Sequence, residues 1–178
     1  MNPTYAVYTH IDKPVSEVFS AIVDHKTLEK VMFQSSSGDL IAGTTVSWDN
    51  GEWSCDVYVS RVVENELIEI QFRPSDFAIP ELRAEDDRDY EAKIVFVFEE
   101  ADVGGTLVTL CEYGWGDDRR SILQSYGHCA GWQEMLMCLK ALLTFAVDLR
   151  SPPQLRPNYS KLWGTAATGN DGVLKYER

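Results

Sequence analysis

The sequence predicts an α+β domain in which an antiparallel sheet of about six strands packs against one long helix near the C-terminus. Short segments rich in β-branched and aromatic residues are separated by turns that contain Gly or Asn, which is typical of strands joined as hairpins. Two short helical patterns follow the first of these segments. After the last one, apolar residues recur every three or four positions, which is the period of an amphipathic helix.

The first strand and the two short helices occupy the N-terminal part of the chain. Tyr5–Ile11 is rich in β-branched and aromatic residues. Pro14 then begins a helical pattern that continues to Val23, because proline is well tolerated in the first turn of a helix. Asp24 can cap a second short helix through Val31, since its carboxylate can accept the free N–H groups of the first turn.

Further segments complete the predicted sheet. Ser35–Gly38 is expected to be a loop, and Asp49-Asn50-Gly51 predicts a tight hairpin because Asn-Gly tolerates positive φ angles. Two alternations fit the last strand, one with Glu112 facing inward and the other with Cys111 facing inward. The predicted strands after the helices are Thr44–Trp48, Glu52–Val63, Leu67–Phe72, Ala92–Phe98 and Thr106–Tyr113.

The long helix is predicted over Arg119–Arg150. The pair Asp117-Asp118 precedes it, as expected of capping residues, and Arg150 would complete its last turn before Pro152-Pro153. Its predicted inward face consists of Ile122, Tyr126, Cys129, Trp132, Leu136, Leu139, Leu143 and Val147.

One domain is predicted over residues 1–150, followed by an extension over residues 151–178. The extension is polar, but it carries large apolar residues such as Leu162 and Trp163, which a disordered tail rarely has. We therefore expect it to pack on its own domain or on a second subunit. The acidic segment Arg73–Tyr90 is predicted to be a long loop, with a short helix at Pro80–Glu85 as an alternative.

The charge of the chain argues against two classes of partner. Its formal net charge is −12, whereas nucleic acids and anionic membranes select basic surfaces. The sequence has no apolar run of about eighteen residues, and its N-terminus lacks the charged and apolar regions of a secretory signal. We therefore expect a cytoplasmic protein that binds neither nucleic acid nor membrane.

Cysteine and histidine spacing predicts neither disulfides nor a metal site. The cysteines form no C-x-x-C pair and lie within predicted strands or helices, which favours free thiols in a reducing compartment. The histidines are scattered, and no G-x-S-x-G, H-E-x-x-H or phosphate-binding loop is present. We expect no metal and no cofactor. The residues concerned are Cys55, Cys111, Cys129, Cys138, His10, His25 and His128.

Three segments, taken in order, carry a resemblance to a known family. They read I-D-K-P-V-S-E-V-F-S-A-I-V-D near the N-terminus, T-L-V-T-L-C-E-Y-G-W after the last hairpin and G-H-C-A-G-W-Q-E-M-L-M-C-L-K-A-L-L in the long helix. This set resembles the START-like helix-grip (SRPBCC) superfamily, and most closely the branch named after the activator of the ATPase of heat-shock protein ninety. The resemblance covers roughly Tyr5 to Asp148.

The resemblance implies a strongly curved sheet that grips the terminal helix around a hydrophobic cavity, but it does not imply one activity. Pockets for apolar small molecules typically measure about 300–1,000 Å³. A core that packs without a ligand is the alternative. The residues expected to line the cavity and bind a ligand are Trp48, Val57, Val59, Ile70, Phe72, Phe96, Phe98, Trp132, Met135 and Leu136.

Glu112 and His128 are the candidate catalytic residues if a reaction occurs. In the register that the resemblance implies, Glu112 faces inward, and His128 lies one turn before Trp132. A buried carboxylate beside an imidazole can act as an acid–base pair, and a structural hydrogen bond is the alternative. Gly127 and Gly131 each cost the helix about 1 kcal/mol relative to alanine, which predicts either close packing against the sheet or room for a ligand.

The leading hypothesis is therefore a non-catalytic domain that binds a hydrophobic small molecule, lipid- or polyketide-like, without a cofactor. One alternative is a co-chaperone-like module that binds a protein partner. Another is a cyclase- or dehydratase-like enzyme that uses His128 and Glu112. A homodimer formed through the C-terminal extension is a further open alternative.

Overall fold

The computed structural model describes residues 4–51, 54–72, 92–117 and 119–150. The acidic segment Arg73–Tyr90, Asp118, Pro152-Pro153 and the extension over residues 151–178 lie outside the described residues. Within the described ranges the elements are β1 (Tyr5–Ile11), α1 (Val15–Val23), α2 (His25–Val31), β2 (Ser35–Ser36), β3 (Thr45–Asp49), β4 (Ser54–Val63), β5 (Leu67–Phe72), β6 (Ala92–Glu100), β7 (Thr106–Tyr113) and α3 (Arg119–Phe145).

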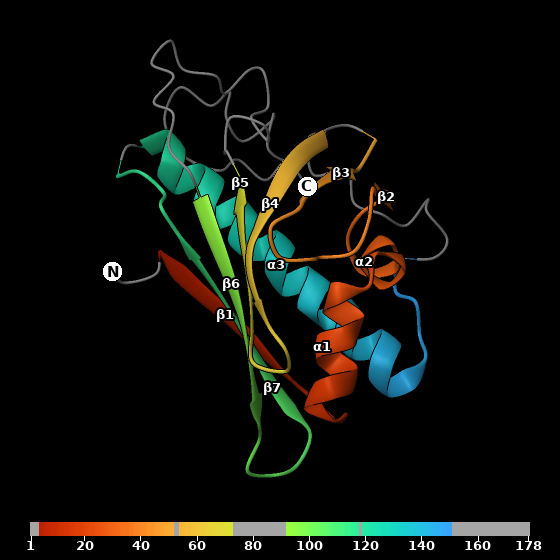
Figure 1. Ribbon diagram of the computed structural model, residues 1–178. Helices are drawn as coiled ribbons and strands as arrows, with labels where there is room; N and C mark the ends of the chain where they lie inside the picture. The colour runs from red at the N-terminus through yellow and green to blue at the C-terminus, as the bar shows by residue number, and fades with distance from the viewer. Residues whose placement is uncertain (1–3, 52–53, 73–91, 118, 151–178) are drawn as a thin grey trace, which may run out of the picture.

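The described strands form one antiparallel sheet in the order β1-β7-β6-β5-β4-β3-β2. The α+β prediction is confirmed, with seven strands in place of about six. The additional strand is Ser35–Ser36, which was expected to be a loop but pairs with Asp49 and Trp48 of β3. In Figure 1, α3 runs obliquely across one face of the sheet, and α1 and α2 lie beside the C-terminal half of α3. This is the predicted helix-grip arrangement.

A change of register in β4 accompanies the bend of the sheet. The pairing of β4 with β5 shifts between Val59 and Arg61, so that Ser60 has no direct partner on β5. An extra residue on one strand increases the local twist and bends that strand. The Ser60 hydroxyl donates to Glu69 Oε1 at 2.7 Å, which holds the irregular residue against the neighbouring strand.

Alternation along the strands places their apolar side chains on the face that α3 covers. On β5, Ile68 and Ile70 are fully buried. On β7, the fully buried residues include Val108, Leu110 and Glu112. The structure therefore selects the first of the two alternations left open by the sequence, and it directs the Glu112 carboxylate into the core.

The turn between β6 and β7 packs against the end of β1. Gly105 has a φ angle of +77°, and a Cβ atom at this position would lie 2.5 Å from the backbone oxygen of Ile11. Only glycine fits such a close approach without a shift of the backbone. The neighbouring Gly104 carbonyl lies 2.6 Å from His10 Nε2, which fastens the same turn to β1.

The long helix ends at Phe145 and not at Arg150 as predicted. Ala146 adopts a φ angle of 54°, and its N–H donates to the Leu142 carbonyl at 3.0 Å. A left-handed residue with this hydrogen bond terminates a helix. The chain then turns back toward α3. Burial raises the pKa of Glu134, and the charge of Arg150 opposes that rise.

Replacing Ala146 with glycine is expected to raise the free energy of unfolding by about 0.5–1 kcal/mol. The left-handed conformation costs an L-residue about 1–2 kcal/mol, and the greater chain entropy of glycine offsets about 0.5–1 kcal/mol of that gain. The control is Ala130→Gly, the same change at an exposed position inside α3, which is expected to destabilise by about 1 kcal/mol. Urea denaturation measures both variants. Destabilisation by both would show that Ala146 is not under conformational strain.

Candidate functional site

The ten side chains predicted to bind a ligand lie together in one buried apolar cluster. Each of them is at most 4% exposed. The ring of Trp132 lies edge-on to Trp48 and Phe96, with centroid distances of 6.4 and 5.9 Å. The structure thus brings these residues together between the sheet and α3. Their role in binding a ligand stays a prediction.

A surface pocket of about 490 Å³ lies elsewhere, where β1 leads into α1. It is lined by residues 12–16 together with Asn65, Glu100 and Gly105. None of these residues belongs to the predicted ligand-binding set, so this pocket does not bear on the site between the sheet and α3.

The inner face of α3 changes character along its length. In the C-terminal half, its buried side chains are mostly large and apolar. In the N-terminal half, Ser121 and Ser125 are 2% and 3% exposed, whereas Ile122 and Tyr126, which were predicted to face inward, are 39% and 61% exposed. The predicted inward face is therefore wrong at Ile122 and Tyr126, and also at Val147, which lies beyond the helix end. Cys129, predicted on the same face, is partly buried against the core.

The prediction failed here for a physical reason. Two rows of side chains, each with a helical spacing, run next to each other along the N-terminal half of α3. Ser121 and Ser125 are spaced by four residues, as are Ile122 and Tyr126. A helical period identifies both rows but does not show which one faces the sheet. The apolar row was the natural choice from the sequence. Packing instead directs the row of small hydroxyl side chains inward.

Gly131 borders open space and not closely packed backbone. A Cβ atom at this position would meet no heavy atom within 4 Å, apart from the adjoining backbone of its own helix. Gly131 comes three residues after His128 and four before Met135, so the three residues share one side of α3. Of the two explanations predicted for this glycine, close packing against the sheet is wrong. Room beside the helix is the one that the structure supports.

Glu112 and His128 meet beside the N-terminal half of α3. The Glu112 carboxylate is fully buried on β7, and its Oε1 atom lies 3.2 Å from His128 Nδ1. The sheet supplies the carboxylate and the helix supplies the imidazole, from positions 16 residues apart in the chain. The two predicted candidates are therefore in contact.

Two aromatic rings fix the orientation of the imidazole. The Phe72 ring stacks on the His128 ring, with a centroid distance of 5.4 Å and an interplanar angle of 14°. Trp115, from the segment between β7 and α3, contacts the same ring edge-on at 4.7 Å and 75°. Trp115 was not among the predicted site residues. The only sequence signal for it was a tryptophan between two glycines directly after a strand.

Two polar atoms near this pair are buried without a hydrogen-bond partner among the described residues. They are Glu112 Oε2 and the hydroxyl oxygen of Tyr5. Tyr5 of β1 is the register partner of Glu112 on β7, and side chains directly opposite each other project from the same face of a sheet. We call Tyr5, Glu112, Ser125 and His128 the polar corner. Sequence analysis missed Tyr5, although its alternation with Val7 along the first strand was a usable signal.

The polar corner can orient an imidazole, exchange a proton with a bound molecule or accept a hydrogen bond from it. The neighbouring Cys129 is not an activated nucleophile. Burial raises the pKa of its thiol, and the charge of Glu112 raises that pKa further, so the less reactive neutral thiol is favoured. A catalytic role for Glu112 and His128 stays a prediction.

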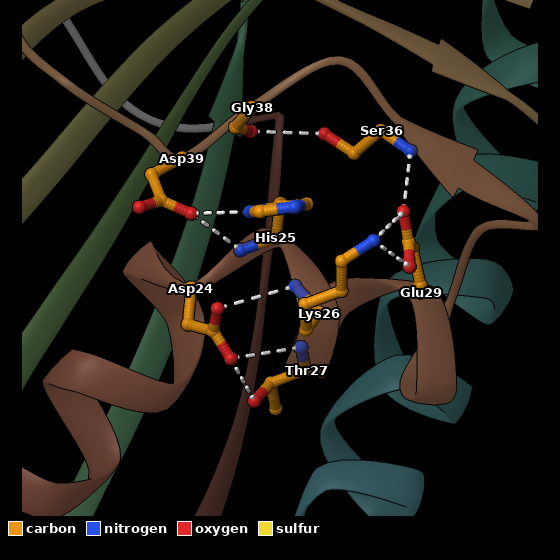
Figure 2. Close-up of polar contacts among 8 residues, drawn as sticks. All are labelled: Asp24, His25, Lys26, Thr27, Glu29, Ser36, Gly38 and Asp39. Atoms are coloured by element: carbon orange, nitrogen blue, oxygen red, sulfur yellow. Dashed lines mark hydrogen bonds and ion pairs between the residues drawn. The ribbon is translucent and has the colours of Figure 1, made fainter.

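A second polar cluster joins the start of α2 to the segment between β2 and β3 (Figure 2). Asp24, His25 and Asp39 each place one potential metal-ligand atom within 4.8 Å of the other two, a spacing that could hold a metal ion. These atoms are already engaged. The Asp24 carboxylate caps α2 by accepting the backbone N–H groups of Lys26 and Thr27, and Asp39 Oδ1 accepts from the His25 backbone N–H at 3.0 Å and lies 2.5 Å from His25 Nδ1. The cluster is therefore explained as a polar connection that secures the start of α2.

Replacing His128 alone, as in His128→Leu, is expected to lower the free energy of unfolding by about 3 kcal/mol, because a buried carboxylate loses its partner. The double variant Glu112→Leu/His128→Leu is expected to recover most of this loss, since replacing both members of a buried polar pair with apolar groups is often nearly neutral. Urea denaturation at neutral pH compares the two. An equal or greater loss in the double variant would show that the contact itself, and not the isolated carboxylate, determines the energy.

The loss of folding stability at acidic pH should depend in part on Asp39. Hydrogen bonds from the backbone N–H and then the side chain of His25 lower the pKa of the Asp39 carboxyl from 3.8. Because the folded pKa is the lower one, ionised Asp39 stabilises the fold above a pH of about 4, and this contribution disappears as the pH falls through the folded value. The difference in urea midpoint between the natural chain and Asp39→Asn should therefore shrink from pH 5 to pH 2. A constant difference would contradict this account.

Solved structures with the same architecture come from several organisms. A protein from Staphylococcus saprophyticus is 28% identical, with a TM-score of 0.61, and the match covers 82% of this chain and 94% of that one. The Aha1 dimer from Colwellia psychrerythraea is 20% identical, with a TM-score of 0.61 and coverage of 79% and 95%. DynU16, a protein of the dynemicin biosynthetic locus, is 18% identical, with a TM-score of 0.62 and coverage of 80% and 48%.

Comparison at the level of sequence identifies the family. No curated protein matches the chain. Among the described residues, no helix is both long enough and apolar enough to cross a membrane. The family model described as Activator of Hsp90 ATPase homolog 1-like protein matches residues 12–144, which span α1 to the end of α3 and include both members of the Glu112–His128 pair. The chain therefore belongs to the family of Activator of Hsp90 ATPase homolog 1-like proteins.

Proposed function

We propose that this domain binds a hydrophobic small molecule, lipid- or polyketide-like, between its sheet and the N-terminal half of α3. The observation that carries the proposal is the set of small residues on this part of the helix, namely Ser121, Ser125 and Gly131. A large apolar side chain buried at any of these positions would contribute about 1.5–3 kcal/mol to stability. Small residues give up that contribution and leave room beside the helix.

The surroundings have the composition of a small-molecule site. Such sites are lined mainly by apolar and aromatic side chains, with a few polar groups that orient the ligand. Phe72 and Trp132 supply buried aromatic surface next to the small residues, and the polar corner supplies the orienting groups. The predicted residues further along α3, such as Met135 and Leu136, pack among themselves and would form the floor of the site.

A second candidate function is contact with another copy of the chain through the outer face of α3. Ile122, Tyr126 and Met137 are exposed on this face, and an exposed apolar stripe on a helix is typical of a docking surface. The related Aha1 structure from Colwellia psychrerythraea was solved as a dimer. Light scattering of the natural chain and of Tyr126→Asp tests this candidate, which requires a dimer that the substitution dissociates.

Filling the space beside Gly131 should abolish ligand binding without unfolding the domain. The natural chain is expected to bind the apolar dye N-phenyl-1-naphthylamine saturably, and Gly131→Leu to weaken that binding about tenfold or more. The matched control is Ala130→Leu, which places the same side chain one residue away at an exposed position. It should leave the affinity unchanged.

Fluorescence titration measures the affinities, and thermal denaturation shows that both variants fold. Gly131→Leu should itself be at least as stable as the natural chain, because leucine favours a helix by close to 1 kcal/mol over glycine. Absence of saturable dye binding by the natural chain, or equal affinity in Gly131→Leu, would refute the proposed function.

A further inference from the structure

We infer that the ligand carries a hydroxyl group, which donates a hydrogen bond to Glu112 Oε2 and accepts one from the Tyr5 hydroxyl. This inference rests on the proposed function and names the chemistry at the polar end of the ligand. It starts from two buried polar atoms, on neighbouring strands, that no described residue satisfies.

The acceptor is Glu112. Its carboxylate is fully buried, and Oε1 is engaged by His128 Nδ1 at 3.2 Å, while Oε2 has no hydrogen-bond partner within the part of the chain that the structure describes. A buried polar atom left in this state has lost its contact with water without gaining a hydrogen bond in exchange, which costs free energy. A ligand that donates to Oε2 recovers this energy, so Oε2 favours molecules that carry a donor.

The donor is Tyr5. Its ring packs against the apolar core, and its buried hydroxyl has no hydrogen-bond partner among residues 4–51, 54–72, 92–117 and 119–150. Tyr5 and Glu112 are register partners in the sheet, which brings their Cβ atoms to about 4.5–5.5 Å on the same face. The Thr4 N–H donates to the Glu112 carbonyl at 2.7 Å, which also joins the two strands beside this pair.

This pair of atoms discriminates between functional groups. A tyrosine hydroxyl can donate and accept, whereas an ionised carboxylate only accepts. An ether or ketone oxygen could accept from Tyr5 but would offer nothing to Glu112. An ammonium group could donate to Glu112 but would leave the Tyr5 hydrogen without an acceptor. An alcohol or phenol satisfies both atoms with one oxygen, and its neutral charge avoids burying another ion beside His128.

From a hydroxyl held by Tyr5 and Glu112, the apolar part of the ligand would extend along α3 toward Gly131. The open space at Gly131 begins about one helical turn, roughly 5 Å, from His128 toward the C-terminus of α3. The Phe72 ring covers the imidazole on the side of β5. A ligand with a hydroxyl at one end and a short hydrocarbon body would therefore place the hydroxyl at Tyr5 and Glu112 and the body beside Gly131.

The test compares 4-alkylphenols with alkyl chains of three to eight carbons with the corresponding 4-alkylanisoles, in which the hydroxyl is methylated. Isothermal titration of the natural chain is expected to show a preference for the phenol of about tenfold or more, since a hydrogen bond to a charged group contributes at least that factor. Tyr5→Phe removes the donor and keeps the ring, and it should reduce the preference markedly. The double variant Glu112→Leu/His128→Leu removes the acceptor and should do the same.

Tyr8→Phe is the matched control. Tyr8 lies on β1 three residues after Tyr5 but projects from the opposite face of the sheet and is 68% exposed. Loss of its hydroxyl should leave the preference for phenols intact. A reduced preference in Tyr8→Phe would show that the effect does not arise from the polar corner.

Two further outcomes separate this inference from the proposed function. Equal affinity for phenols and anisoles, with the naphthylamine dye still bound, would overturn the hydroxyl inference and leave apolar binding in place. This result is also the one expected if only a water molecule occupies the two atoms. If the natural chain bound neither the dye nor either series of compounds, the proposed function itself would be overturned. A preference that survives both Tyr5→Phe and the double variant would place the hydroxyl elsewhere and refute the inference.

Discussion

The packing of Trp132 into the concave face of the sheet is the contact on which the rest of the structure depends. Its ring meets Trp48 of β3 and Phe96 of β6, which are on different parts of the sheet. An aromatic ring held edge-on by two others can tolerate little rotation. Trp132 therefore sets the rotation of α3 about its own axis, and that rotation decides which residues of the helix face the sheet.

The two halves of α3 serve different purposes as a result. In the C-terminal half, large apolar side chains fill the interior and supply most of the stabilising burial. In the N-terminal half, the same rotation buries Ser121 and Ser125, brings His128 to Glu112 of the sheet and turns Ile122 and Tyr126 outward. A tightly packed half thus supports a half that gives up stability, which is the arrangement that the proposed binding site requires of its scaffold.

The polar corner illustrates why buried polar groups are costly and informative. Glu112 enters the core because its strand alternates in step with Val108 and Leu110. His128 satisfies one of its oxygens, and the rings of Phe72 and Trp115 hold that imidazole in place. The polar connection at Asp24, His25 and Asp39 contrasts with it. There both Asp24 oxygens accept from backbone N–H groups, Asp39 Oδ1 contacts His25, and Asp39 is exposed to solvent. Among the carboxylates of the described residues, the one in the polar corner combines deep burial with an unmatched oxygen.

The sequence by itself determined the order and type of the elements, because hydrophobic period, turn residues and helix caps are local signals. Tyr5–Ile11, the Asp24 cap and Leu67–Phe72 are found where the sequence predicts them. It also identified Glu112 and His128 as a candidate pair, through family resemblance. Tertiary structure alone decided the pairing of Ser35–Ser36 with β3, the turn at Ala146 and the inward row of α3. Each of these depends on contacts between distant segments, and a periodic pattern gives the spacing of a helical row without saying which row the sheet will cover.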